Sequence, residues 1–334
     1  MTKKPIMYIG GDGYSYEHFD PILGQISSHF ESIIRNLRIK TPLGKDVNID
    51  LYLDATDPEV INAHAKRTSK ENSTYEIRFS AGLSYHVWLS SRYILADYKF
   101  FNWLEKCKIK KKEIRKKGRK EFLADFSYFT CSYYIILHEL AHIVLGHCDF
   151  INDEMGLDAW EEFNIDSASL TENDIKIRKA FEAEADRQAG VWLAAFFANA
   201  LGPDSKGIDF VFPSKNEAYE FYIYSITAVF VLLQQLSQRI CTIHPLPNQR
   251  QNIVSMAILQ YFDKFEKYNR NQFVKQLITS MASAGNSLGL EGSRSAIEIA
   301  QNALEMVYVD QIVKETNIRR FQHIVVSIFE KNNG

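Results

Sequence analysis

The chain has 334 residues, of which 46% are hydrophobic, so it is long enough to bury a sizeable core in one elaborated domain or in two. Its formal net charge of −2 gives no overall attraction to nucleic acid or to an anionic membrane. These values argue against a protein whose whole surface is adapted to a polyanion. Interaction partners have to be inferred from individual sites.

The cysteine pattern and the N-terminus indicate an intracellular protein. The four cysteines lie far apart and contain no CxxC pair, which is typical of reduced thiols rather than of a disulfide framework. The N-terminal residues lack the long apolar segment and the cleavage site of a secretion signal. The most apolar later stretch, Phe221 to Leu233, has thirteen residues, whereas a membrane-spanning helix needs about 20. We therefore predict a cytoplasmic location, a core helix at this stretch and no transmembrane segment.

The first hundred residues predict an α/β segment. The predicted strands are PIMYIG at 5–10, VNIDLYLD at 47–54 and TYEIRFS at 74–80, with an amphipathic helix from Glu17 to Arg38. A helical, aromatic-rich pattern follows from Ala81 to Glu105. We expect TYEIRFS to be the edge strand of a small sheet, where a substrate backbone can pair.

Residues 106–120 form a basic segment that holds ten Lys and Arg residues against one acidic residue, Glu113. A block of like charges repels itself, so a solvated helix or a mobile connection is the first interpretation. The alternative is contact with an acidic partner, RNA or lipid headgroups. Because no aromatic residue interleaves the lysines, the stacking platforms of single-strand nucleic-acid binders are missing, and no clear nucleic-acid site is predicted.

After the basic segment the pattern is helical almost throughout. The predicted helices are Glu121 to His147, Thr171 to Leu201, Asn216 to Arg239, Asn248 to Tyr268, Asn269 to Ala284, and Ser295 to the end. The predicted fold class is α+β, mainly α, with a zincin-like helical core and a small N-terminal sheet. The predicted organisation is an N-terminal α/β part at 1–105, the basic connection at 106–120, and the helical core at 121–334.

The strongest motif is HELAH, in which two histidines flank a glutamate on one predicted helix. His138 and His142 are four residues apart, which places both imidazoles on the same helix face, where they can converge on one ion. Glu139 then lies beside them, placed to take a proton from zinc-bound water. The alternative is a pair of ordinary core histidines. Two imidazoles and a carboxylate buried without a metal would need several hydrogen-bond partners.

A catalytic zinc site needs a third protein ligand. Leu145 and Cys148 stand where a metzincin has glycine and histidine, so that class is excluded. Glu182 and Asp186 lie four residues apart on a second predicted helix, so Glu182 can reach the ion while Asp186 orients a ligand histidine.

Two further polar residues near these motifs receive no role in the predicted site. The predicted helix continues through His147, which lies five residues after His142 on the wrong face for a ligand, so we expect it to face away, cap the helix end or contact the rest of the fold. Glu184 points elsewhere on its helix, and we expect it to be a solvated carboxylate.

Three strings in order carry a resemblance to a known family: HELAHIVLGH, EAEAD and the HPLPNQR segment at 244–250. They resemble the gluzincin metallopeptidases that include the CAAX prenyl proteases and the bacterial heat-shock membrane protease. The family pattern is HExxH with a further histidine five residues on, then ExxAD and HPxxxxR. The resemblance covers about 120 residues and implies these roles: zinc ligands His138, His142 and Glu182, general base Glu139, a supporting Asp186, and His244 with Arg250 near the substrate.

These features predict a zinc-dependent endopeptidase with one zinc per chain and a protein or peptide substrate. The chain lacks the spanning helices of the membrane members, and it is also similar to the soluble Lit-type phage-exclusion peptidases and to the repressor-cleaving ImmA/IrrE type. An alternative is a metal-binding regulatory or interaction module that uses its basic segment. A hydrolase that acts on a bond other than the peptide bond is a third alternative. Glu139 argues against the regulatory module, because a structural zinc site has no use for an unligated base.

Overall fold

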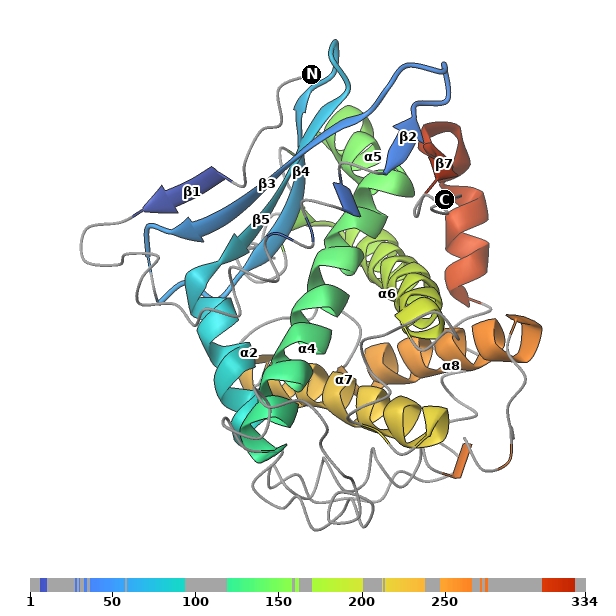
Figure 1. Cartoon of the computed structure of the whole chain (residues 1–334). Helices are drawn as coiled ribbons and strands as arrows, with labels where there is room; N and C mark the ends of the chain where they lie inside the picture. The colour runs from blue at the N-terminus through green and yellow to red at the C-terminus, as the bar shows by residue number, and fades with distance from the viewer. Residues whose placement is uncertain are drawn as a thin grey trace, which may run out of the picture.

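The computed structural model describes residues 7–10, 28, 30, 33–34, 37–57, 59–93, 119–157, 160–161, 170–200, 212, 214–237, 247–265, 271, 274–275 and 308–327. Within these residues the fold is α+β and mainly α, as predicted. A twisted sheet forms one side of the molecule and a group of helices forms the other (Figure 1).

The main sheet has five strands in the order β1-β3-β5-β4-β6. β1, β3 and β5 run parallel to one another, and β4 is antiparallel to both β5 and β6. The strands are β1 (Met7–Gly10), β3 (Asn48–Ala55), β5 (Thr74–Ser80), β4 (Ala63–Ser69) and β6 (Trp160–Glu161).

The prediction that TYEIRFS is an edge strand is wrong, because β5 lies between β3 and β4. Tyr75, Ile77 and Phe79 alternate along β5 and are buried, as expected for a central strand. β4 was not predicted because its sequence, AHAKRTS, lacks an apolar alternation. A turn joins it to β5, and Ser73 in that turn has a positive φ of 48°. Among the described strands of this sheet, β1 and β6 are the outermost.

Apart from α5, which was not predicted, the helices match the predicted ranges to within a few residues at each end that is described. They are α2 (Ala81–Tyr93), α4 (Arg119–Val144), α5 (His147–Glu154), α6 (Glu172–Ala200), α7 (Lys215–Ser237) and α8 (Pro247–Phe265). α4 packs against β4 and β5 on one side and against α2, α6 and α7 on the others (Figure 1). The apolar stretch from Phe221 to Leu233 lies in α7, and its described side chains are mainly buried, which confirms a core helix.

The C-terminal segment differs from the predicted continuous helix. Residues 308–315 are helical, but Asn317 then adopts a left-handed conformation with φ of 52°. A short 3-10 helix η4 (Ile318–Phe321) and strand β7 (Ile324–Ser327) follow. β7 pairs antiparallel with β2 (Arg38–Lys40), so Arg38 belongs to a strand and not to the end of the first predicted helix. The β-branched run Ile-Val-Val favours a strand over a helix here.

Several other predictions are partly covered by the described residues. Cys131 and Cys148 are free and buried, whereas Cys107 and Cys241 lie outside the described residues. Most of the first predicted helix, residues 94–118, which include most of the basic segment, and most of 269–307 also lie outside them. The domain division and the acidic partner at 106–120 therefore stay predictions.

Membrane spanning was assessed on the described helices. None of them alone has the length and hydropathy of a membrane span, and α4 and α5 reach that criterion only as a pair bent by 53°.

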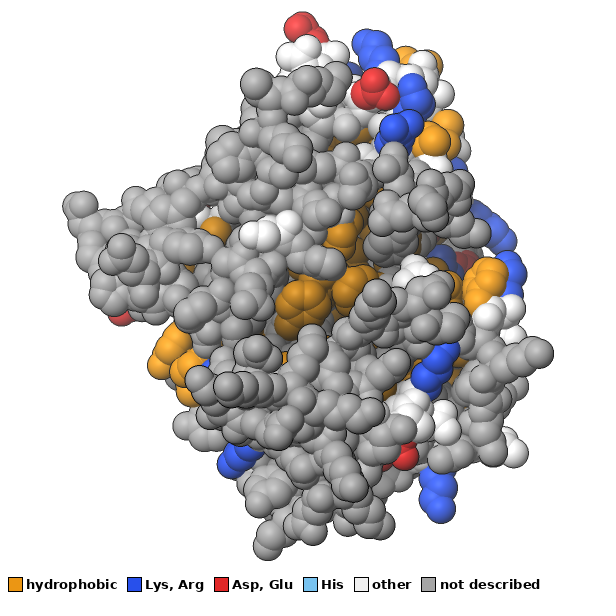
Figure 2. Space-filling view, in the orientation of Figure 1, with side chains coloured by type: hydrophobic (Ala, Val, Ile, Leu, Met, Phe, Trp, Pro, Cys, Tyr) orange, Lys and Arg blue, Asp and Glu red, His pale blue; other side chains and the backbone are white. Residues whose placement is uncertain are grey.

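On the face shown in Figure 2, described charged side chains lie mainly toward the edges, and hydrophobic side chains are seen near the middle.

Candidate metal centre

α4 brings the two histidines of the HELAH motif together. Its 26 residues contain no proline or glycine, so the backbone hydrogen-bond ladder is uninterrupted through the motif. His138 and His142 are both almost fully buried, and their Nε2 atoms are 3.0 Å apart. The predicted convergence of the two imidazoles is present.

Glu182 on α6 faces both imidazoles. Its Oε2 lies 3.3 Å from His138 Nε2, and its Oε1 lies 3.4 Å from His142 Nε2. The side chain is fully buried. His138, His142 and Glu182 thus form a buried group that could hold a metal ion.

Local sequence sets where α6 begins and how closely it packs against its neighbour. Thr171 caps the helix by accepting a hydrogen bond from the backbone of Asp174 (3.1 Å), and the Asp174 carboxylate accepts one from the Thr171 backbone (3.0 Å). Further along, Gly190 allows α8 to approach closely, since a Cβ at this position would lie 3.0 Å from both Ala257 and Val254. α6 is therefore held against α8, which carries Arg250.

Asp186 supports His138, as the sequence predicts. Its Oδ1 lies 2.9 Å from His138 Nδ1, the ring nitrogen that faces away from Glu182. Tyr134, one helical turn before His138, donates a hydrogen bond to the same carboxylate. The contact between Asp186 and His138 Nδ1 fixes the orientation of the His138 ring and leaves its Nε2 as the nitrogen that can bind a metal.

Arg250 lies beside the carboxylates of α6 and is 4% exposed. Its Nε donates to Asp186 Oδ2 at 2.8 Å, and its Nη2 lies 3.3 Å from Glu182 Oε2. The resemblance placed Arg250 near the substrate, and the structure shows it as an ion-pair partner of the site carboxylates. His244, the other residue of that motif with a predicted role, lies outside the described residues.

The electrostatics of the centre follow from its burial. Burial lowers the pKa of His142 to about 3. Burial also opposes protonation of His138, but the Asp186 and Glu182 carboxylates outweigh it and raise the His138 pKa well above its usual value. Burial opposes ionisation of Asp186, yet Arg250 and His138 lower its pKa to about 2. The Asp186 and Glu182 carboxylates therefore favour a positive charge beside them, at His138.

The prediction for His147 holds only in part, and one glycine explains why: His147 lies outside the group that could hold a metal, but it contacts a ligand histidine. His147 is buried, and its Nδ1 lies 2.9 Å from His142 Nδ1. The prediction assumed one continuous helix, but α4 ends at Val144 and Gly146 turns the chain with φ of 82°. α5 starts at His147 in a new direction, so this ring returns to the site. A left-handed glycine two residues after the last helical residue is a known helix-end signal, and Gly146 could have shown the turn.

Glu184 is the second correction, because it is 2% exposed and not solvated. Its Oε2 lies 3.2 Å from His147 Nε2, and its Oε1 accepts a hydrogen bond from Arg319 at 2.7 Å. Burial opposes its ionisation, but His147, Arg319 and Arg187 together lower its pKa. α6 therefore presents three carboxylates to the histidines: Glu182 to His138 and His142, Asp186 to His138, and Glu184 to His147. Sequence spacing does not reveal Arg319, because it lies far along the chain.

Glu139, the predicted general base, follows His138 on α4 and is 1% exposed. Its charge raises the pKa of the Cys148 thiol on α5, after the larger effects of burial and of Asp149. Glu139 therefore lies in the interior at the junction of α4 and α5.

The donor set fits a divalent metal. With Zn–N distances of about 2.0–2.1 Å, a tetrahedral ion has ligand atoms about 3.3–3.4 Å apart. The Nε2 atoms of His138 and His142 are 3.0 Å apart, and each lies 3.3 or 3.4 Å from a different oxygen of the Glu182 carboxylate, so these separations are close to that value. A cation at these atoms would also balance the negative charge that raises the His138 pKa. Imidazole nitrogens with one carboxylate suit zinc, although other first-row metals also bind such sets.

Comparisons of the chain with protein-family models, with curated proteins and with solved structures find no match.

Proposed function

We propose that the chain is a zinc-dependent metalloendopeptidase of the gluzincin type. The observation that supports this most is the buried His–His–Glu donor set with a further buried carboxylate, Glu139, on the helix that carries both histidines. A structural zinc site is closed by four protein ligands, whereas a catalytic site has three and an open position. Three donors with an adjacent acid favour the catalytic kind.

In this proposal His138, His142 and Glu182 hold the zinc. When bound, zinc supplies a Lewis acid that polarises the scissile carbonyl and lowers the pKa of water toward about 7. Glu139 takes a proton from the attacking water and delivers it to the leaving amine as the peptide C–N bond breaks.

Other residues of the chain support these steps without reacting. Asp186 holds the His138 ring through Nδ1, and Arg250 balances the charge of the two buried carboxylates on α6. His244 is the proposed donor to the oxyanion, by resemblance to the family motif. The resemblance to Lit-type peptidases supports a protein substrate and a role in phage defence.

The test is a comparison of new protein N-termini in cells that express the parent chain or the Glu139→Gln variant. Glutamine cannot accept the proton, so we expect cleavage to fall by about 10²–10⁴-fold, while the purified variant keeps its zinc because Glu139 is not a ligand. New N-termini at equal levels in both cells would exclude Glu139 as the base. Zinc in the parent without any cleavage would favour the regulatory module.

A further inference from the structure

In the C-terminal segment, residues 308–327, the short helix η4 packs against α5, which follows the end of α4 (Figure 1). The backbone N–H of His323 donates to the Val144 carbonyl, the last residue of α4, at 2.8 Å. A Cβ on Gly146 would lie 2.6 Å from backbone atoms of Phe321. The segment therefore covers the corner that turns His147 toward His142.

A continuous chain of hydrogen bonds joins this segment to His142. His142 Nδ1 lies 2.9 Å from His147 Nδ1, and His147 Nε2 lies 3.2 Å from Glu184 Oε2. Arg319 Nη2 donates to the other oxygen of Glu184 at 2.7 Å. The three buried members of the chain are at most 2% exposed, whereas the Arg319 side chain is 50% exposed.

The proton positions along this chain are consistent with metal binding at His142. If Nε2 of His142 faces the metal, its Nδ1 carries a proton and donates to His147 Nδ1. His147 must then carry its proton on Nε2, where the Glu184 carboxylate accepts it. One set of tautomers satisfies each contact, and each donor faces an acceptor.

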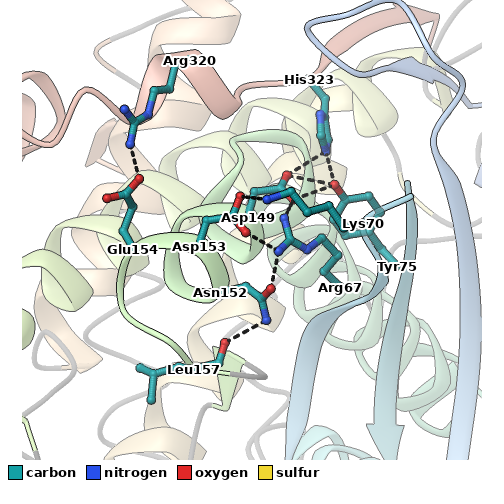
Figure 3. A network of polar contacts seen from close by, with 10 residues as sticks. All are labelled: Arg67, Lys70, Tyr75, Asp149, Asn152, Asp153, Glu154, Leu157, Arg320 and His323. Atoms are coloured by element: carbon teal, nitrogen blue, oxygen red, sulfur yellow. Dashed lines mark hydrogen bonds and ion pairs between the residues drawn. The ribbon is translucent and has the colours of Figure 1, made fainter. Parts of the chain in front are cut away.

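Independent contacts anchor the segment on the C-terminal side of Arg319 (Figure 3). Arg320 forms an ion pair with Glu154 at the end of α5. His323 Nε2 lies 2.9 Å from the Tyr75 hydroxyl, which donates to Asp149 at 2.8 Å. Because these anchors do not involve Glu184, the segment stays docked when the Arg319 contact is removed.

We propose that Arg319, Glu184 and His147 are positioning residues that orient the metal ligand His142, so that docking of the C-terminal segment increases the affinity of the site for its metal. The proposal rests on the metal-binding part of the proposed function and not on peptide hydrolysis. Its readout is metal affinity, so it can fail while the proposed function holds, and the reverse is also true.

Two neighbouring arginines provide a matched pair of variants. Arg319 and Arg320 lie on the same 3-10 helix, their side chains are 50% and 48% exposed, and each pairs with one carboxylate, but only the partner of Arg319 is linked to His142. We expect Arg319→Gln to weaken zinc binding by about two- to fivefold, in line with the strength of part-exposed ion pairs, while Arg320→Gln has no effect. Arg319→Lys should restore part of the affinity. Competition with a chelator of known zinc affinity measures all three.

A variant of His147 tests the buried part of the chain. The His147 ring stacks on Phe181 with centroids 4.3 Å apart, so His147→Phe keeps this packing and removes both ring nitrogens. We expect zinc affinity to fall by about 10–100-fold and the visible absorption spectrum of the cobalt(II)-loaded protein to change, because the His142 ring loses its partner.

Equal zinc affinity in Arg319→Gln, Arg320→Gln and the parent would overturn the proposal. An unchanged affinity and cobalt spectrum in folded His147→Phe would do the same. If His147→Phe does not fold, the arginine pair decides alone, because both side chains are at the surface.

Discussion

The two candidate metal histidines are held in different ways. The outer nitrogen of His138 meets the Asp186 carboxylate directly, and Asp186 is enclosed by core helices and paired with the buried Arg250. The outer nitrogen of His142 meets a carboxylate only through His147, and one arginine that holds this carboxylate comes from the C-terminal segment. One half of the site is therefore set by the core and the other half by a part-exposed segment that is distant in sequence.

Asp186→Ala disrupts the half of the site that the core holds, and we expect it to have the largest effect. The change leaves Arg250 and His138 buried without their main partner, so stability should fall by about 3–5 kcal/mol and zinc affinity by about 10–100-fold. Glu184→Ala should cost less stability, because Arg319 and Arg187 are partly exposed and can be hydrated. Urea denaturation of both variants measures the difference, and a larger loss in Glu184→Ala would reverse the comparison.

Gly146→Ala disrupts the peripheral half of the site, the half that the C-terminal segment holds. A left-handed residue with a Cβ costs about 1–2 kcal/mol, and here the Cβ would also lie 2.6 Å from the Phe321 backbone. We expect the free energy of unfolding to fall by at least that amount. Relative to the parent, amide hydrogen exchange should become faster at 318–327 by more than it does in α6. Gly44→Ala is the control, since it has a similar φ of 81° and open space around its Cβ. Equal losses in the two variants would show that contact with Phe321 contributes nothing.

A smaller effect concerns the pH dependence of the C-terminal anchor. Burial lowers the pKa of His323 below its usual value, with Asp149 opposing the shift. The unfolded chain therefore binds a proton at His323 in a pH range where the folded chain does not, so this residue makes stability fall as pH decreases below about 6.5. The slope from one such group is at most about 1.4 kcal/mol per pH unit. His323→Gln should flatten the decrease between pH 7 and pH 5, and parallel curves for parent and variant would contradict this.

The sequence predicted the core half of the site well and the peripheral half poorly. Spacing of four residues on a helix predicted that His138 and His142 converge and that Asp186 shares a face with Glu182, and the resemblance to the gluzincin pattern linked Glu182 to the two histidines. Helical periodicity fails where the helix ends, and the turn at Gly146 brings His147 to His142.

The fold shows the same division between local and distant information. Long apolar helices were predicted to within a few residues, and TYEIRFS was recognised as a strand. Its place in the sheet was wrong because it depends on pairing with β4, whose polar sequence has no strand signal. β7 pairs with β2, a strand near the other end of the chain, and the local sequence of β7 does not show which strand it pairs with.

The metal content of purified protein tests the central claim most directly. Inductively coupled plasma mass spectrometry on the parent, Glu139→Gln and Glu182→Ala should find about one zinc per chain in the first two and none in the third, because Glu182 is a ligand and Glu139 is not. No divalent metal in the parent, or full zinc occupancy in Glu182→Ala, would contradict the account.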